Sequence, residues 1–286
     1  MLDKQKACLV NCELFGKHAA TWESAIVPLW QGVYDSLVDR ARIAEGSRVL
    51  DVGTGTGEVA LRLGRLVGKR GSVVGIDGQP EMLQIAERKA KASRSDKVEF
   101  REMSMEDMSL PDGSFDSVVG NYSLCCSMDY EAVLAECHRV LKPGGRLTYN
   151  HFGPSDPLTY EVMMKIFEDY KTKTPSKKLE EIREATTLQS EGVEKYRDPA
   201  VTLGAIRSVG FDEAEATIVQ RVIDYKDAGS FVDEWLNFDW SSETQEIPAA
   251  RLKTFRKEAI EAVSPLSKGK GFRVESDELF FTGLKR

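Results

Sequence analysis

The fold is decided by one stretch of the chain, Val49-Leu50-Asp51-Val52-Gly53-Thr54-Gly55-Thr56-Gly57. Its apolar first half predicts a short buried strand at 48–52. Glycine at every second position after that strand lets the backbone turn sharply and approach a ligand closely. Residues 58–67 then carry apolar side chains at 59, 63, 66 and 67, the one-sided spacing of an amphipathic helix. The segment therefore predicts a strand, a glycine turn that can hold a ligand, and a helix.

The order of strand, turn and helix repeats up to about residue 152. This alternation predicts βαβ units and a parallel sheet with right-handed crossovers. Further strands are expected at 72–76, 98–103, 115–120 and 146–152, with helices from Pro80 and over 130–141, the last ended by Lys142-Pro143-Gly144-Gly145. Beyond residue 152 we expect a helix at 156–170, a polar stretch to Asp198, a helix at 200–208, a strand within 216–225, a helical region at 230–263 and a last strand within 278–284.

Composition narrows the class of protein. The 286 residues carry a formal charge of −7 and are 41% hydrophobic, which is typical of a globular chain with one large domain or two small ones. No apolar run approaches the roughly 18 residues of a membrane span, and the charged residues 1–6 are unlike a signal peptide. The acidic balance disfavours a nucleic-acid partner. Five cysteines without a CxxC pair favour a reducing, cytoplasmic location, and the oligomeric state stays open.

Two kinds of ligand compete for the glycine turn. A nicotinamide dinucleotide favours G-x-G-x-x-G/A, in which the third small residue allows close packing beside the pyrophosphate. Here that third position is Glu58, whose carboxylate at a helix start would face phosphate with the wrong sign. The G-x-G-x-G spacing after Asp51 instead suits a phosphate-free ligand with an amino-acid ammonium group, a description that fits S-adenosylmethionine. Asp77, after the second strand, can then accept from the two ribose hydroxyls; the alternative is a turn-forming role before Gly78.

Several blocks in a fixed order make the resemblance to a known family specific. They are residues 49–57, Gly75-Ile76-Asp77, Leu110-Pro111-Asp112-Gly113-Ser114-Phe115-Asp116 and His138-Arg139-Val140-Leu141-Lys142-Pro143-Gly144-Gly145. The region that holds them, about a third of the chain, resembles class I S-adenosylmethionine-dependent methyltransferases of the UbiE/COQ5-like kind (methyltransferase type 11). Ser208-Val209-Gly210-Phe211 also resembles the Gly-Phe that precedes the sixth strand in that family.

The resemblance implies the fold class and the domain organisation. The class is α/β, a Rossmann-like doubly wound seven-stranded sheet that is mostly parallel, has an antiparallel last strand and carries added helical lid elements. Residues 1–286 are expected to form a single methyltransferase domain. Its core is expected at 40–153, 199–225 and 271–286, and its lid and acceptor elements at 1–39, 154–198 and 226–270.

The resemblance also implies that S-adenosyl-L-methionine is the cofactor. Gly53, Thr54 and Gly55 are expected to lie under its methionine part, with Asp51 reaching the ammonium group. Asp77 is expected to hold the ribose.

The adenine contact is where this chain departs from the family pattern. Many members place an aspartate after the third strand, and Ser104 stands at that position here. Ser104 or Glu106 is therefore expected to accept the adenine amino group, and Met105 to pack on the ring. Gly78 and Gln79 are expected to flank the adenine, and Asn121 to lie beside the sulfonium.

Two residues are candidates for catalysis. Tyr122 follows the fourth strand, where the family places groups beside the sulfonium; the alternative is ordinary packing at a strand end. His151 lies at the carboxyl end of the fifth strand, where open α/β sheets place ligands, and imidazole titrates near neutrality. It is the first candidate for a general base, the alternative being a histidine without a role. A base is needed only if the acceptor must lose a proton.

Acceptor recognition is expected from outside the core. All four tryptophans (Trp22, Trp30, Trp235 and Trp240) lie there, and Phe231 recurs with Trp235 at helical spacing. These rings either form an apolar lid over the methyl group or attach the added helices to the sheet.

The cysteines allow a further reading. The Cys125-Cys126 pair, near the expected active-site mouth, can bind a soft metalloid, so arsenite methylation is an alternative to the commoner small apolar packing. No metal is expected: Cys8, Cys12 and His18 lack a fourth ligand, and packing on a helix face is preferred for them.

The predicted function is methyl transfer from S-adenosylmethionine to a small apolar or aromatic acceptor by in-line displacement. Whether the accepting atom is O, N, C or S stays open. One alternative is a catalytically silent cofactor-binding regulatory or scaffold protein. Another is a nicotinamide oxidoreductase, which Glu58 disfavours.

Overall fold

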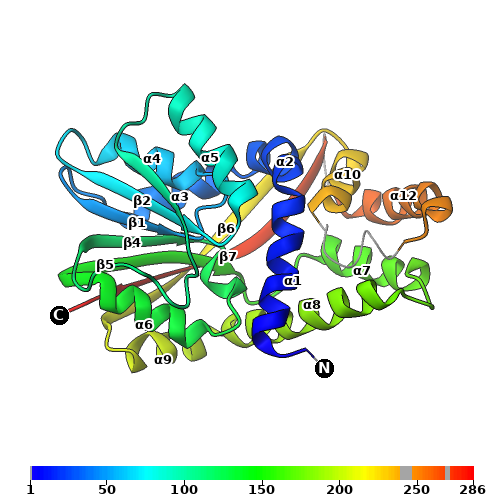
Figure 1. The fold of residues 1–286 in the computed structure, drawn as a ribbon. Coiled ribbons are helices and arrows are strands. Elements are labelled where there is room, and N and C mark those ends of the chain that lie inside the picture. The colour runs from blue at the N-terminus through cyan, green and yellow to red at the C-terminus, as the bar shows by residue number, and fades with distance from the viewer. Residues whose placement is uncertain (1, 239–246, 268–270) are drawn as a thin grey trace.

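The computed structural model describes residues 2–238, 247–267 and 271–286, and a seven-stranded sheet forms its centre (Figure 1). The strand order is β3-β2-β1-β4-β5-β7-β6; β7 runs antiparallel to both neighbours, and the other pairs are parallel. The predicted doubly wound sheet with an antiparallel last strand is confirmed. The strands are β1 (Arg48–Val52), β2 (Ser72–Asp77), β3 (Val98–Glu102), β4 (Phe115–Asn121), β5 (Leu141–Phe152), β6 (Asp212–Tyr225) and β7 (Phe272–Leu284).

Helices cover both faces of the sheet. Side chains of α3 (Gln31–Ala41) and α4 (Glu58–Leu66) bury one face together with Val49 and Val119. Side chains of α6 (Tyr130–Val140) and α9 (Pro199–Ser208) bury the other face. α5 (Pro80–Ala92) packs on β2 and β3. Adjacent strand residues divide between the two faces, which is why the strands at the centre read as continuous apolar runs.

The two helices on the second face begin at aspartate caps. Asp129 accepts the amide of Ala132 at 3.1 Å at the start of α6. Asp198 accepts the amide of Ala200 at 2.8 Å at the start of α9, where Pro199 occupies the first helical position. Both caps satisfy amides that lack a partner within the helix.

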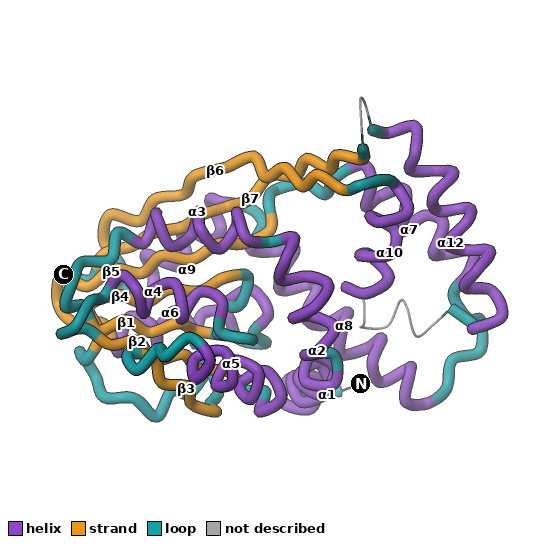
Figure 2. Tube along the Cα trace, turned by 90° about the horizontal axis from the view of Figure 1, so that it is seen from above, coloured by secondary structure: helices purple, strands orange, loops and turns teal. Residues whose placement is uncertain are grey.

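The remaining helices extend beyond the sheet. Figure 2 shows α7, α10 and α12 together at the far end of β6 and β7. Their buried side chains form a separate apolar cluster with the ends of those strands, including Tyr225 and Phe272. The bounds are α1 (Lys4–Lys17), α2 (Ala19–Thr21), the π-helix η1 (Trp22–Ile26), α7 (Leu158–Tyr170), α8 (Lys177–Tyr196), α10 (Ala228–Phe238), α12 (Ala249–Val263) and the 3₁₀ turns η2 (Val27–Leu29), η3 (Leu124–Cys126) and η4 (Ser264–Leu266).

The polar stretch expected up to Asp198 is instead largely the 20-residue helix α8. Its apolar stripe is narrow, because Leu179, Ile182 and Ala185 are buried three residues apart while most of its other side chains are polar. The stripe packs against α1, more than 160 residues earlier in the chain. Tertiary packing therefore stabilises a helix that the polar composition of the segment did not predict.

Three strands begin earlier than predicted. β5 includes the expected breaker at 142–145, because Leu141 already pairs with Phe115 and the amide of Gly144 donates to the carbonyl of Lys285. β6 and β7 begin at Asp212 and Phe272 and pair with each other along nearly their whole length. Pairing partners distant in sequence prolong these strands beyond their local apolar signal.

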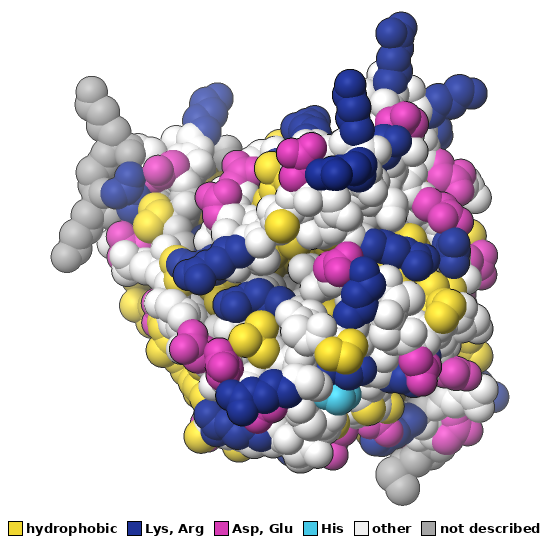
Figure 3. Space-filling model, turned by 90° about the vertical axis from the view of Figure 1, so that its left-hand side faces the viewer, with side chains coloured by type: hydrophobic (Ala, Val, Ile, Leu, Met, Phe, Trp, Pro, Cys, Tyr) yellow, Lys and Arg dark blue, Asp and Glu magenta, His cyan; other side chains and the backbone are white. Residues whose placement is uncertain are grey.

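Two surface properties are relevant to function. None of the described helices has both the length and the apolarity that a membrane span requires. On the face that carries the C-terminus, Figure 3 shows Lys and Arg side chains interspersed with Asp and Glu. Ion pairs such as Lys142 with Asp116, at 2.7 Å, account for part of this mixture.

We predict that Phe281→Ala lowers the free energy of unfolding by about 3–5 kcal/mol, because a fully buried ring leaves a cavity in the sheet core. Phe281 stacks on Tyr149 with ring centroids 5.2 Å apart. Urea denaturation measures the change, and Ile218→Ala on the exposed side of β6 is the matched control. Equal effects of the two substitutions would contradict the proposed core.

Candidate functional site

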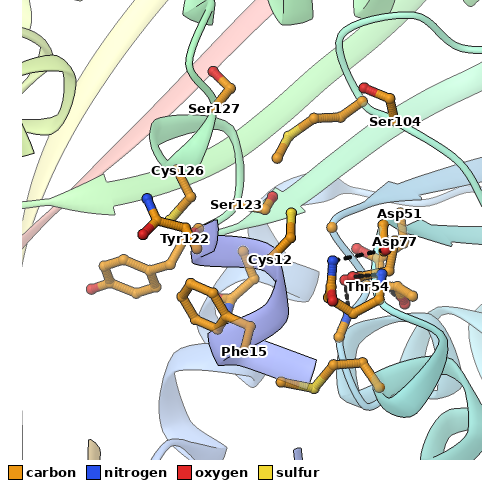
Figure 4. Close-up of a pocket in the computed structure, with 18 of the residues that line it drawn as sticks. Cys12, Phe15, Asp51, Thr54, Asp77, Ser104, Tyr122, Ser123, Cys126 and Ser127 are labelled. Carbon is orange, nitrogen blue, oxygen red and sulfur yellow. Dashed lines mark hydrogen bonds between the residues drawn. The ribbon is translucent and has the colours of Figure 1, made fainter. Parts of the chain in front are cut away.

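A cavity of about 450 Å³ opens at the carboxyl ends of β1, β2 and β4. This is the edge at which open α/β sheets bind ligands. The β1–α4 turn, the residues after β2, β3 and β4, and the N-terminal helix α1 supply its walls. In Figure 4, Asp51, Thr54 and Asp77 lie together, while Tyr122 and Cys126 lie apart from them, on the other side of Cys12 and Phe15 of α1.

The glycine turn is held in a backbone conformation that other residues rarely adopt. Gly53, Gly55 and Gly57 have φ of +67°, +54° and +85°. A Cβ atom on Gly53 would lie 2.3 Å from the Cβ of Ser123, so the close approach of β1 and β4 requires glycine there. The amide of Thr54 donates to the carbonyl of Ile76 at 2.8 Å and fixes the turn against β2.

Asp51 is a buried carboxylate beneath this turn. Its Oδ2 accepts the hydroxyl of Thr54 at 2.7 Å. Burial raises the pKa of Asp51 to about 7, although hydrogen bonds from Thr54 and from the amide of Ala60 favour ionisation, and the charge of Asp77 raises it further. A carboxylate in this state favours a ligand that brings a positive charge.

Asp77 joins two turns. Its Oδ2 accepts the amide of Gly55 at 2.8 Å and its Oδ1 the amide of Gln79 at 3.0 Å. Burial raises the pKa of Asp77 to about 6 against these backbone bonds. Each oxygen has a further lone pair, so the carboxylate can accept from a pair of ligand hydroxyls as well.

The residues proposed for the adenine side also line the cavity, namely Gly78, Gln79, Ser104, Met105 and Glu106. The hydroxyl oxygen of Ser104 accepts the amide of Glu106 at 3.1 Å, which leaves its own hydrogen to donate. Glu106 Oε1 accepts the amides of Met128 and Asp129 at 2.8 and 3.1 Å, so this carboxylate is already engaged with the loop before α6.

Glu58 is compensated rather than isolated. Its carboxylate pairs with Arg62 at 2.5 Å and also with Lys89. Burial opposes its ionisation, but these two partners hold the pKa of Glu58 below its usual value. The structure thus weakens the argument that its charge excludes a diphosphate; the bulk of Glu58 where a dinucleotide turn needs a small residue is the part that still applies.

Tyr122 and Asn121 lie in the wall at the end of β4. Tyr122 has φ +48°, and its amide donates to Asn150 Oδ1 at 2.8 Å. Its hydroxyl donates to the buried Glu278 at 2.7 Å, and Glu278 lies 3.5 Å from Arg221. Burial raises the pKa of Tyr122 well above its usual value, so the phenol is neutral and its hydrogen is engaged. The ring forms part of the wall, and a chemical role stays a prediction.

The structure does not bring His151 to this cavity. His151 is fully buried in β5, where its Nδ1 lies 3.0 Å from the carbonyl oxygen of Phe152. Burial lowers its pKa to about 4. Neighbouring strand residues face opposite sides of the sheet, and Asn150 and Phe152 contact Tyr122 on the cavity side. His151 therefore points to the other side of the sheet, away from the cavity in which the predicted base would act.

All eleven residues predicted for cofactor binding and Tyr122 line the one cavity. No residue of α1 or α8 was predicted for the site, although both helices lie in the expected lid and acceptor elements 1–39 and 154–198. Cys8, Cys12 and Phe15 repeat at the i, i+4, i+7 spacing of one helix face, and this face lines the cavity. Gln189 of α8 also lines it and donates to the carbonyl of Cys126 at 2.8 Å. The periodicity of α1 was available in the sequence, but nothing in the sequence indicated which surface it covers.

The aromatic residues expected as a lid divide into two groups. Trp22 lines the cavity, and Trp30 packs on Tyr122 with ring centroids 5.1 Å apart. Phe231 and Trp235 instead pack in the cluster of α7, α10 and α12. For these two rings the second predicted alternative therefore applies, attachment of the added helices. Trp240 lies outside the described residues.

The fold and this cavity together define a class of protein, the Rossmann-like domains that bind a nucleoside cofactor at the carboxyl edge of a seven-stranded sheet. The chain belongs to the methyltransferase domain family, whose model matches residues 43–200, more than half of its length. This confirms the family resemblance found in the sequence.

Comparisons with individual proteins agree with this assignment. The chain is 40% identical over 130 residues to a demethylmenaquinone methyltransferase of Thermus thermophilus, covering 46% of the chain and 58% of that protein. It is 36% identical over 123 residues to a ubiquinone/menaquinone biosynthesis C-methyltransferase, UbiE, of Hahella chejuensis, covering 42% and 49%. The chain thus spans about half the length of these curated relatives. The YcgJ protein of Bacillus subtilis shares the fold, with a TM-score of 0.58 and 19% identity over 89% of the chain and 98% of that structure.

We predict that Gly53→Ala destabilises the protein by about 2 kcal/mol or more, because positive φ and the contact with Ser123 both oppose a Cβ atom. Thermal unfolding measures the change. Gly32→Ala in α3, where a Cβ meets no atom within 4 Å, is the matched control and is expected to stabilise by about 0.5–1 kcal/mol. If Gly53→Ala leaves the thermal stability unchanged, the turn can accommodate a Cβ atom, which contradicts the contact with Ser123.

Proposed function

We propose that this chain moves the methyl group of S-adenosyl-L-methionine to a small apolar or aromatic acceptor. Membership of the methyltransferase domain family supports the reaction class. The observation that carries the proposal is the pair Asp51 and Asp77, two carboxylates of raised pKa at the glycine turn of one cavity. Their chemistry matches a ligand that combines a cation with a ribose diol and has no phosphate.

The residues of the turn hold the cofactor in this proposal. Asp77 accepts from the ribose hydroxyls while it keeps the amides of Gly55 and Gln79. Asp51 lies below the turn, where its charge attracts the ammonium group of the methionine part. Glycine at position 53 keeps the turn close to Ser123, because a Cβ atom there would lie 2.3 Å from the Cβ of Ser123. When bound, the cofactor supplies a sulfonium methyl group that is already electrophilic.

The protein then has to align the acceptor and exclude water. Phe15 of α1, Tyr122 after β4 and Trp22 of η1 offer aromatic surface to an acceptor in the same cavity. α1 lies across the cavity, since it packs on both α5 and α8. The names of the two relatives refer to demethylmenaquinone and to ubiquinone/menaquinone biosynthesis, so quinone-type rings are the first acceptors to test.

The setting of the reaction is part of the same proposal. All five cysteines are free thiols, which supports a reducing cytoplasm. The partner is a small molecule, and α1 and α8, from the expected lid elements 1–39 and 154–198, cover it in the cavity.

We predict that Asp77→Asn weakens binding of S-adenosylmethionine by more than about 1 kcal/mol, because a charge-assisted hydrogen bond to the ribose is lost. The asparagine carbonyl can still accept the amide of Gly55, so the fold is expected to persist. Titration calorimetry measures the affinity, and Asp96→Asn, on the exposed loop before β3, is the control.

Methyl-labelled cofactor and a panel of quinone-type rings test the reaction itself. Label in the extracted ring, reduced by Asp77→Asn at low cofactor concentration, is the expected result. Cofactor binding without transfer to any acceptor would favour the silent scaffold. Nicotinamide dinucleotide binding without S-adenosylmethionine binding would favour the oxidoreductase.

We also predict that cofactor binding releases protons near pH 6. Burial leaves Asp51 and Asp77 partly protonated there, with pKa values of about 7 and about 6, and a bound cation favours their ionised forms. Lowered pKa values in the complex mean fewer bound protons, so affinity rises with pH up to about 7 and then levels off. Calorimetry in buffers of different ionisation enthalpy measures the release, which Asp51→Asn should reduce. Proton uptake at pH 6 would contradict the proposed contacts.

A further inference from the structure

The cavity wall is rich in sulfur. Seven of its side chains contain sulfur, more than half of the five cysteines and eight methionines of the chain. Thiols and thioethers are soft ligands that prefer soft ions and metalloids. The seven are Cys8, Cys12, Met82, Met103, Met105, Cys126 and Met128.

Two of the thiols form a pair. Cys8 and Cys12 stand one turn apart on α1, and their Sγ atoms are 3.9 Å apart. Both are half-buried and line the cavity. Leu9, which also lines the cavity, is 64% exposed, so this part of the cavity wall reaches the protein surface. The helix backbone holds both sulfurs in place before any ligand arrives.

The two thiols of the pair differ in acidity. The hydrogen bond from Cys12 lowers the pKa of the Cys8 thiol. The same bond, together with burial and the charges of Asp77 and Glu106, raises the pKa of Cys12. Cys8 is therefore the more readily ionised of the two thiols, and thiolate is the form that binds soft ligands.

We propose that Cys8 and Cys12 form a two-thiol site for a soft ligand with two open coordination positions, the chemical class of monosubstituted trivalent arsenicals. Phe15 follows on the same face of α1, and Figure 4 shows it close to Cys12, so it offers an aromatic surface to the organic substituent. A Cβ atom on Gly78 would lie 3.9 Å from Cys12 Sγ, so the pair adjoins the predicted ribose and adenine side of the cavity. Methylation of a bound arsenical would rest on the proposed function, whereas binding of the arsenical by the two thiols does not depend on it.

Two thiols, rather than three, set the ligand class. Among residues 2–238, 247–267 and 271–286, no three His, Cys, Asp or Glu side chains gather as a metal-binding group. Inorganic arsenite has three positions for sulfur, and a two-thiol site leaves one of them on oxygen. An arsenical R–As=O instead reacts with both thiols to give R–As(SR′)₂ and one water; two S–H bonds and the As=O bond break, two As–S bonds form, and arsenic stays trivalent.

Phenylarsine oxide is the probe for the test. The full-length reduced protein is incubated with it and then with a monothiol, which removes singly attached arsenic but not a dithiol chelate. Intact-mass analysis is expected to show one phenylarsenic group, which dithiothreitol then removes. Cys8→Ser and Cys12→Ser are each expected to weaken retention by at least about tenfold. Cys137→Ser, in the sheet core, is the matched control and should retain the group.

Several outcomes would overturn the proposal. Loss of the group in Cys126→Ser but not in Cys8→Ser would move the site to the Cys125-Cys126 pair. Arsenite binding as tight as that of phenylarsine oxide would indicate three thiols. Retention by all variants would leave no defined site. Circular dichroism confirms that the serine variants fold, and calorimetry with S-adenosylmethionine on arsenic-free protein tests the proposed function separately.

Discussion

The site depends on one carboxylate that ties two backbone turns together. Asp77 accepts the amide of Gly55 from the β1–α4 turn and that of Gln79 from the start of α5. The glycine turn can meet Asp77 only because its glycines adopt positive φ and because Gly53 leaves room for Ser123 of the neighbouring strand end. The cavity therefore forms where the ends of β1, β2 and β4 meet and where Asp77 holds the turns after β1 and β2 together.

This geometry leaves the protein with an electrostatic cost. Asp51 is buried and Asp77 is half-buried, and the charge of Asp77 raises the pKa of Asp51. Burial of carboxylates without cationic partners is unfavourable. Carboxylates whose pKa values are perturbed in this way are typical of functional sites. Glu58, only a few residues away, shows the contrast, because Arg62 and Lys89 compensate its charge. Glu58 is thus paired with cations, whereas Asp51 and Asp77 form no ion pair with another described residue.

The other half of the cavity is assembled from segments far apart in the chain. α1 and α8 pack against each other across more than 160 residues, with Asn11 donating to the carbonyl of Ala185 at 3.2 Å. α8 in turn bonds the loop of Cys126 through Gln189. These contacts put Cys8, Cys12 and Phe15 opposite the glycine turn. Two walls of different chemistry result: the carboxylates and backbone amides of the turn on the sheet side, and the two thiols and the aromatic ring of α1 on the helix side.

The sequence by itself determined the sheet core and eleven residues, predicted for cofactor binding, that line the cavity. Their signals are local, since a glycine turn, an aspartate after a strand and apolar periodicity follow from backbone geometry within a few residues. Only the tertiary structure decided what α1 and α8 cover, that Phe231 and Trp235 attach helices, and that His151 faces away from the cavity. The orientation of His151 depends on strand register, because a shift of one residue moves a side chain to the opposite face of the sheet. The other outcomes depend on packing between segments that are distant in the sequence.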